Sequence, residues 1–172
     1  MEIKEILNEQ RIYAVINHVP ILRESEVHLF EELIGLYRPQ RVLEIGTGCG
    51  YQAAVLSRLC VEVYSMERLK GLNEKAQTLL RPFRIPNVHL LLGDGMLGFP
   101  SGAPYAGIIA AAGGDAVPLA WCDQLAVGGR LVAPMALTGG QQMLLVIDKT
   151  PHGLKQNVLE PVHFVPLKSG IA

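Results

Sequence analysis

Apolar residues follow two patterns along this chain: a helical spacing typical of amphipathic helices, and short continuous runs typical of buried strands. Between Glu24 and Tyr37 they recur at three- and four-residue steps, which predicts an amphipathic helix ended by Pro39. Strand-length apolar runs and helical patterns then alternate. We expect strands at 41–46, 61–66, 88–92, 105–111 and 130–134, and helices at 5–15, 51–59, 69–83 and 115–126. Asp115 is expected to cap the last helix, and Gly128 and Gly129 to turn the chain after it.

The last third of the chain has a different pattern. Residues 142–148 and 158–165 are strand-like runs joined by residues 149–153, with no helical stretch between them, which predicts an antiparallel hairpin. Alternating strands and helices before it imply a parallel sheet covered on both faces. The expected fold is therefore α/β: a Rossmann-like, seven-stranded, mostly parallel sheet with helices on both faces and an antiparallel C-terminal hairpin.

Composition narrows the class of protein. A chain of 172 residues with 49% hydrophobic residues suits a single domain spanning residues 1–172. The net charge is −1 and no run of Lys or Arg could follow a phosphate backbone, so nucleic acid is not an expected partner. We find no signal-peptide pattern and no apolar run of about 18 residues, which predicts a cytoplasmic protein without a membrane partner.

Cysteine and histidine spacing suggests no metal site. The three cysteines are scattered, so free thiols are expected, and the five histidines lack the spacing of metal ligands. Cys49 has no base partner and is interpreted as a packing residue. Trp121 is expected in the core.

A glycine-rich loop, residues 46–50, follows the first predicted strand and precedes a helix. Its bare backbone N–H groups could receive an anionic group. The order is Glu44-x-Gly46-x-Gly48-x-Gly50, whereas the dinucleotide fingerprint needs a third glycine where Tyr51 stands. This spacing disfavours NAD, and a simple tight turn remains the alternative for the loop by itself.

Acidic residues follow the next two predicted strands. Glu67 ends the second strand, where an α/β nucleotide-binding fold presents a carboxylate to ribose hydroxyls. Asp94 lies between Gly93 and Gly95 after the third strand. A solvated glutamate and a plain turn are the alternatives for each residue taken singly. Together with the glycine loop they predict one ligand site at the carboxyl edge of the sheet.

These segments together resemble the protein-L-isoaspartate O-methyltransferases. The resemblance rests on segments 42–56 (VLEIGTGCGYQAAVL), 63–68 (VYSMER), 93–98 (GDGMLG), 123–132 (DQLAVGGRLV), the pair 141–142 (QQ) and 163–167 (HFVPL). It implies an S-adenosylmethionine-dependent O-methyltransferase that repairs isoaspartyl residues of damaged proteins. It also implies that the loop lines the methionine part of the cofactor, Glu67 its ribose, and Asp94 with Gly95 its adenine. The expected cofactor-binding residues are Glu44, Gly46, Thr47, Gly48, Gly50, Glu67, Asp94 and Gly95.

The residues that depart from the family pattern are those expected to recognise the substrate that accepts the methyl group. Alignment places Leu22 on the family's substrate-contacting serine, and leucine cannot donate that hydrogen bond. The region of residues 1–23 is shorter than usual, and Ala106 replaces a common aspartate. His18 and Arg23 flank this segment, where they could meet an anionic substrate or be plain surface residues. The alternatives are therefore a methyltransferase acting on another carboxylate or small-molecule acid, or a non-catalytic binding homologue.

No catalytic side chain is predicted. Methyl transfer from a sulfonium is an in-line displacement for which a protein mainly aligns the reactants and excludes water. An isoaspartyl carboxylate with a pKa of about 4 is already ionised at neutral pH and needs no general base. The lack of an obvious His/Asp pair therefore agrees with O-methylation of an acid.

Overall fold

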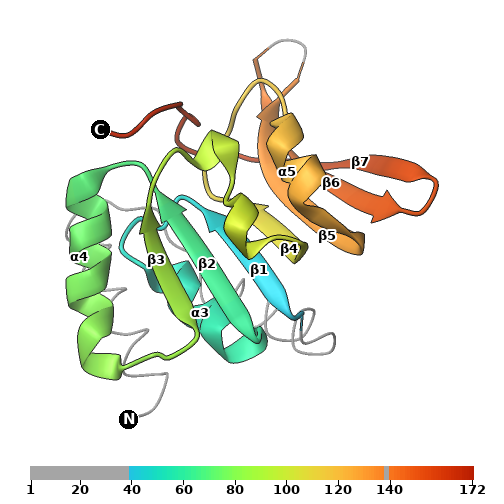
Figure 1. The fold of residues 1–172 in the computed structure, drawn as a ribbon. Helices are drawn as coiled ribbons and strands as arrows, with labels where there is room; N and C mark the ends of the chain where they lie inside the picture. Colours follow the sequence, from blue (N-terminus) through green and yellow to red (C-terminus); the bar gives the residue numbers. More distant parts are fainter. Residues whose placement is uncertain (1–38, 138–139) are drawn as a thin grey trace.

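The computed structural model describes residues 39–137 and 140–172, and they form one seven-stranded sheet in the order β3-β2-β1-β4-β5-β6-β7 (Figure 1). Strands β1 to β5 pair in parallel, and β6 and β7 add in antiparallel fashion at one edge. The predicted architecture is confirmed. The strands are β1 Arg41–Ile45, β2 Glu62–Glu67, β3 Val88–Leu92, β4 Tyr105–Ala110, β5 Leu125–Ala136, β6 Gln142–Thr150 and β7 Gly153–Pro161.

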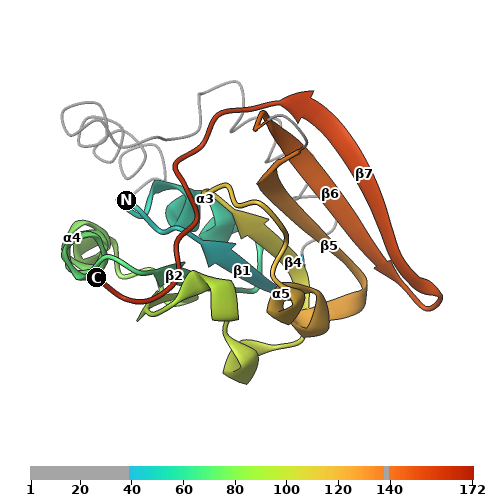
Figure 2. The same ribbon diagram turned by 90° about the horizontal axis from the view of Figure 1, so that it is seen from above.

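Helices cover both faces of this sheet, as Figure 2 shows from above. Helix α3 (Tyr51–Leu59) packs on the face that carries Val42 and Val63, and α4 (Lys70–Leu80) lies beyond it beside β3. Helix α5 (Leu119–Gln124) packs on the opposite face, where Trp121 joins Leu43 in the larger core cluster. Short 3₁₀ turns follow α4 and β3: η1 Arg81–Phe83, η2 Gly95–Leu97 and η3 Pro100–Gly102.

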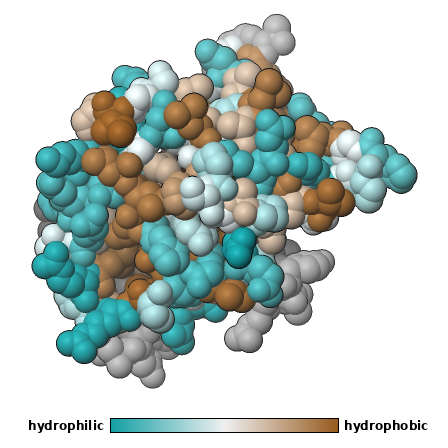
Figure 3. All heavy atoms as spheres, in the orientation of Figure 1, coloured by the Kyte–Doolittle hydropathy of each residue, from teal (hydrophilic) through white to brown (hydrophobic). Residues whose placement is uncertain are grey.

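Hydrophilic residues cover two outer regions of the face seen in Figure 3. The outward side of α4 and the tip of the β6–β7 hairpin are mainly hydrophilic in Figure 3. No helix within 39–137 or 140–172 has the length and apolarity required to cross a bilayer.

The predicted helix at 115–126 is wrong at its start. Helix α5 begins only at Leu119, because Pro118 lacks an N–H and restricts Val117 to extended backbone. Asp115 therefore caps nothing. At the other end, the Lys149 ammonium donates to the carbonyl oxygens of Cys122 and Leu125, each at 2.7 Å, which ends the helix after six residues.

The predicted turn at Gly128 and Gly129 is also wrong. Strand β5 runs through both glycines, and its pairing with β4 shifts there from Tyr105↔Leu125 to Gly107↔Arg130. Gly128 has φ +85°, the left-handed region that glycine adopts without a Cβ penalty. The pair therefore makes a bulge within a long strand.

The hairpin is confirmed, although its strand limits differ from the prediction. Both strands extend to a turn at residues 151–152, and β7 ends at Pro161 instead of continuing to Val165. The chain then leaves the hairpin and passes back over the sheet toward α4 (Figures 1 and 2). The helices predicted at 5–15 and 24–37 lie outside the described residues.

Candidate functional site

The glycine loop joins β1 to α3 with three residues in left-handed backbone conformations. The φ angles are +93° at Gly46, +55° at Gly48 and +85° at Gly50. Side chains are strained at such angles, and a Cβ on Gly50 would also lie 3.0 Å from Leu80 Cδ1. Glycine is therefore required for the loop to fold back over the ends of β1 and β2.

The loop amides are engaged within the protein, which corrects the expectation of bare N–H groups. The N–H groups of Gly46 and Thr47 donate to Met66 O at 2.8 and 3.4 Å, and that of Gly50 donates to Thr47 O at 2.8 Å. Gly48 N–H donates to Glu67 Oε2 at 2.9 Å. An anion arriving at this loop would have to displace those acceptors, so the loop is a poor phosphate cradle.

Glu67 lies at the carboxyl end of β2, as predicted, and links the loop to the start of α4 through two hydrogen bonds. Its Oε2 accepts from Gly48 N–H, and its Oε1 accepts from Leu69 N–H at 3.0 Å. The side chain is only 5% exposed. A carboxylate has about four lone-pair sites, so two hydroxyl donors could still be accepted.

Asp94 follows β3 at the same edge, also as predicted. Its Oδ1 caps the η2 turn by accepting from Met96 N–H at 2.9 Å. Gly95 leaves no room for a side chain, since a Cβ there would lie 2.6 Å from Ile45 Cγ2. The Gly95 carbonyl accepts from Trp121 Nε1 at 2.8 Å, which joins this turn to the core helix α5.

The C-terminal segment reaches this edge as well, and sequence reasoning missed it. Gly170 N–H donates to Asp94 Oδ2 at 2.7 Å, and Arg68 Nε donates to Gly170 O at 3.1 Å. Ala172 forms backbone hydrogen bonds with Arg68 and Lys70 at 2.9 and 2.8 Å. No local pattern could reveal contacts between residues 76 to 104 positions apart.

Glu44 lies beneath the loop and is fully buried, on the side of β1 that faces α3. Its Oε2 lies 2.5 Å from the Ser65 hydroxyl, which lies 2.7 Å from Thr47 Oγ1. Burial raises the pKa of Glu44 to about 8. Ser65 was not predicted, although a polar residue in the apolar β2 run, opposite Glu44 in the register, was the available signal.

The segment after β7 is fixed across the same edge of the sheet, where β4 and β5 end. Gln142 accepts from Phe164 N–H at 2.7 Å and donates to Phe164 O at 3.2 Å. Gly113 pairs with Val165 O at 2.8 Å and with Leu167 N–H at 2.7 Å. Two matched segments of the sequence, 141–142 and 163–167, are thus in contact.

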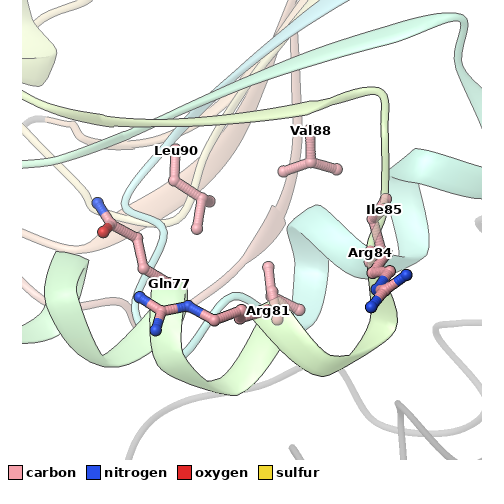
Figure 4. A pocket seen from close by; sticks show the side chains of 7 residues that line it. Gln77, Arg81, Arg84, Ile85, Val88 and Leu90 are labelled. Atoms are coloured by element: carbon pink, nitrogen blue, oxygen red, sulfur yellow. The ribbon is translucent and has the colours of Figure 1, made fainter.

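A hollow of about 340 Å³ lies elsewhere, between α4 and the start of β3 (Figure 4). Arg81, Arg84 and Gln77 rim an apolar wall that includes Ile85 and Val88. It adjoins the amino end of β3, whereas the glycine loop follows the carboxyl end of β1, so it belongs to a different part of the molecule.

Other sequence candidates contribute little to the described site. Leu22, His18 and Arg23 lie outside the described residues. Cys49 is buried in the loop, and burial raises the pKa of its thiol, which agrees with a packing role. Residues 39–137 and 140–172 contain no group of three or more side chains arranged to hold a metal ion.

The residues present suit a cation bearing hydroxyl groups. Two carboxylates lie at the carboxyl ends of neighbouring strands: Glu67 ends β2 and Asp94 follows β3. Glu67 and Asp94 keep free lone pairs. Since the loop amides are already engaged, a pyrophosphate would find few donors there, whereas a sulfonium nucleoside would find acceptors for its ribose and adenine.

A family profile described as protein-L-isoaspartate(D-aspartate) O-methyltransferase matches residues 13–172. The protein-L-isoaspartate O-methyltransferase 2 of Cupriavidus necator is 54% identical over 140 residues, covering 76% of this chain and 46% of its own. The protein-L-isoaspartate O-methyltransferase of Ralstonia nicotianae is 58% identical over 134 residues, covering 76% of this chain and 42% of its own. The chain thus spans about half the length of these curated relatives.

Solved structures agree on the fold. A protein-L-isoaspartate O-methyltransferase matches with a TM-score of 0.77 and 28% identity, over 99% of this chain and 67% of its own. A Plasmodium falciparum structure, described as a putative enzyme of that name in complex with S-adenosyl-L-homocysteine, matches with a TM-score of 0.74 and 22% identity, over 86% of this chain and 75% of its own.

Proposed function

Because the chain belongs to the protein-L-isoaspartate(D-aspartate) O-methyltransferase family, we propose that it transfers a methyl group from S-adenosylmethionine to the free carboxylate of isoaspartyl residues in damaged proteins. The reaction would repair such residues by activating them as esters. We place it in the cytoplasm, since Cys49, Cys60 and Cys122 are free thiols, as is usual in a reducing compartment.

One observation carries this proposal. The ends of β1, β2 and β3 bring the glycine loop, Glu67 and Asp94 to one edge, and the loop amides are engaged by protein acceptors. This arrangement disfavours a dinucleotide and suits a cationic nucleoside, because carboxylates attract positive charge and accept from hydroxyl and amino groups.

Each residue of the edge has a proposed role. Glu67 would accept from the ribose hydroxyls through its unused lone pairs, and Asp94 from the adenine amino group. Gly95 would lie beside the base, on a turn that packs closely against Ile45. The loop residues Gly46, Thr47, Gly48 and Gly50, with Glu44 beneath them, would surround the methionine part.

The chain itself contributes alignment more than acid–base chemistry. The cofactor supplies an electrophilic methyl group on a positively charged sulfur. The segment 164–167, fixed by Gln142 and by Gly113 just after β4, lies at the same edge of the sheet and would help to exclude water from the acceptor. An ionised carboxylate needs no base to attack a methyl group, so alignment is what the protein must supply.

The cofactor assignment is tested by calorimetric titration of S-adenosylmethionine. Glu67→Ala and Asp94→Ala should each weaken binding about 10- to 100-fold, the effect of losing charge-assisted hydrogen bonds. Glu62→Ala is the matched control, because Glu62 lies at the other end of β2 and pairs with His89 at 2.6 Å. Unchanged binding by the first two variants would refute the assignment.

The acceptor is tested separately. A labelled donor should methylate an isoaspartyl peptide and leave the matching aspartyl peptide unlabelled. The second candidate function, methylation of another acid, is favoured by Leu22 at the position of the family's serine. Labelling of a small acid with neither peptide labelled would select it, and cofactor binding without any labelling would indicate a non-catalytic homologue.

A further inference from the structure

Three polar side chains form a buried line beneath the glycine loop. Glu44 Oε2 lies 2.5 Å from Ser65 Oγ, and Ser65 Oγ lies 2.7 Å from Thr47 Oγ1. All three residues are at most 4% exposed. The line runs from the interior of the sheet to the loop that the proposed function assigns to the methionine part of the cofactor.

Glu44 is in an environment that favours its neutral form. It forms no ion pair with the described residues. The Gln52 amide lies near it and opposes the rise of its pKa, yet no donor among the described residues reaches hydrogen-bond geometry at Oε1. The groups facing it are Glu67 from β2, Gln52 from α3 and the Cys49 thiol of the loop, none of them cationic. A buried carboxylate with an unpaired oxygen is far more costly than a neutral acid with an unpaired carbonyl.

The charge of Glu44 sets the direction of the hydrogen bonds in this line. If Glu44 is ionised, Ser65 donates to it and Thr47 donates to Ser65, so Thr47 has no hydrogen left. If Glu44 is protonated on Oε2, the oxygen 2.5 Å from Ser65 Oγ, it donates to Ser65 and Ser65 donates to Thr47. The Thr47 hydrogen then has no acceptor among the described residues. In that second state Thr47 is a free donor on a loop whose amides at residues 46, 47, 48 and 50 are already engaged.

We propose that Glu44 and Ser65 are positioning residues that turn the Thr47 hydroxyl into a hydrogen-bond donor for the carboxylate of the bound cofactor's methionine part. This inference rests on the proposed function. Cofactor binding then selects the protonated form of Glu44, and above the pKa of this group binding takes up one proton from the solvent.

The expected signature is a pH-dependent affinity. Since the pKa of Glu44 in the free protein is about 8, a ligand that binds only the protonated form should bind about tenfold more weakly at pH 9 than at pH 7. S-adenosylhomocysteine is the suitable probe, because it keeps the amino acid end and lacks the sulfonium charge.

The test is calorimetric titration of S-adenosylhomocysteine between about pH 6.5 and 9.5, in pairs of buffers with different ionisation enthalpies that count protons. Glu44→Gln is the matched variant: its amide donates to Ser65 at every pH and never ionises. Between pH 7 and pH 9 the affinity of the wild type should fall about tenfold more than the affinity of this variant. Binding to the variant should also lack the proton uptake that is due to Glu44. The ionisation of the ligand affects both proteins alike. The charge of Glu44 contributes to the raised pKa of the Cys49 thiol, so both proteins are compared in a Cys49→Ala background, where the difference isolates Glu44.

Thr47→Val tests whether the charge of Glu44 affects cofactor affinity through the Thr47 hydroxyl or through its electrostatic field alone. Valine keeps the branched shape and removes the hydroxyl, so the variant should bind more weakly at pH 7 and lose the Glu44-dependent pH profile. A pH profile retained in Thr47→Val, a wild-type profile equal to that of Glu44→Gln, or affinity that rises with pH would each overturn the inference. Absence of binding by the wild-type protein at every pH would instead refute the proposed function.

Discussion

Gly93 and Gly95, the two glycines that flank Asp94, are held in place by close packing. Cβ atoms built on them would lie 2.5 Å from Met66 Sδ and 2.6 Å from Ile45 Cγ2. Met66 ends in a flexible chain, whereas Ile45 is part of β1 and is only 3% exposed. Gly95 is therefore the stricter requirement, and it positions the turn beneath the adenine side of the proposed site.

Gly95→Ala should destabilise the protein by about 1–3 kcal/mol, because an added methyl group must displace a strand side chain. Gly71→Ala is the matched change in helix α4, where nothing lies within 4 Å of the new Cβ. It should stabilise the protein by about 0.5–1 kcal/mol through helix propensity. Urea unfolding compares the two variants, and equal effects would show that crowding at Gly95 is relieved cheaply.

Glu44→Gln should also change how stability depends on pH. Burial raises the pKa of Glu44 from 4.5 to about 8, so the folded protein binds this proton more tightly than the unfolded chain. That contribution is fully present below the unfolded pKa and is lost as pH rises through about 8. Glutamine should therefore raise the urea midpoint more at about pH 8.5 than at about pH 5. A constant difference between the two proteins would mean that Glu44 does not titrate in this range.

At the scale of elements, one ion pair links the parallel part of the sheet to its antiparallel edge. Arg130 of β5 and Asp148 of β6 face each other in the register and form two hydrogen bonds, at 2.6 and 2.9 Å. The hydrogen bond from Arg130 holds the pKa of Asp148 below its ordinary value. Both side chains are partly exposed, so solvent screens much of this interaction.

Asp148→Asn should lower stability at neutral pH by less than about 1 kcal/mol. Because the folded pKa is depressed, the contribution is present above the unfolded pKa and is lost as pH falls through the folded one. Thermal unfolding of the variant and the wild type should therefore converge in acid. A difference that persists after Asp148 is protonated would assign the effect to strand pairing instead of charge.

The segment after β7 depends on one side chain. Gln142→Met removes both hydrogen bonds to the Phe164 backbone while keeping the volume of the side chain. Hydrogen exchange at the Phe164 amide should become at least about tenfold faster, as expected for the loss of a hydrogen bond of about 1.4 kcal/mol. Gln141→Met, at the exposed neighbouring position, should leave this exchange unchanged. Equal exchange in the two variants would mean that Gly113 alone holds the segment.

The accuracy of the element predictions varies with how local their signals are. The strands at 41–46, 61–66, 88–92 and 105–111 match β1 to β4 within one residue, since buried parallel strands are continuous apolar runs bounded by turn residues. The helix predicted at 115–126 is wrong at its start because Pro118 lacks an N–H and restricts Val117 to extended backbone. The bulge at Gly128 and the end of β7 at Pro161 depend on pairing with neighbouring strands, which periodicity does not report.

At the scale of the whole molecule, the sequence predicted which strand ends carry Glu67 and Asp94 but not all of the contacts around them. Parallel strands place their carboxyl ends at one edge, so Glu67 and Asp94 could be assigned to one site from the chain alone. Ser65 and Gly170 could not be assigned, because their roles depend on side-by-side packing of distant segments. The cofactor contacts of the predicted residues stay predictions until a ligand is titrated.

Trp121 is the single tryptophan of the sequence, so it dominates the intrinsic fluorescence of the protein. It is fully buried in the core, and its ring nitrogen is bonded to the carbonyl oxygen of Gly95. Its fluorescence therefore comes from one known position, coupled to the proposed adenine side and shielded from water. Emission from the native protein should lie toward short wavelengths and change in intensity when a nucleoside enters, so an unlabelled sample can report both occupancy and unfolding.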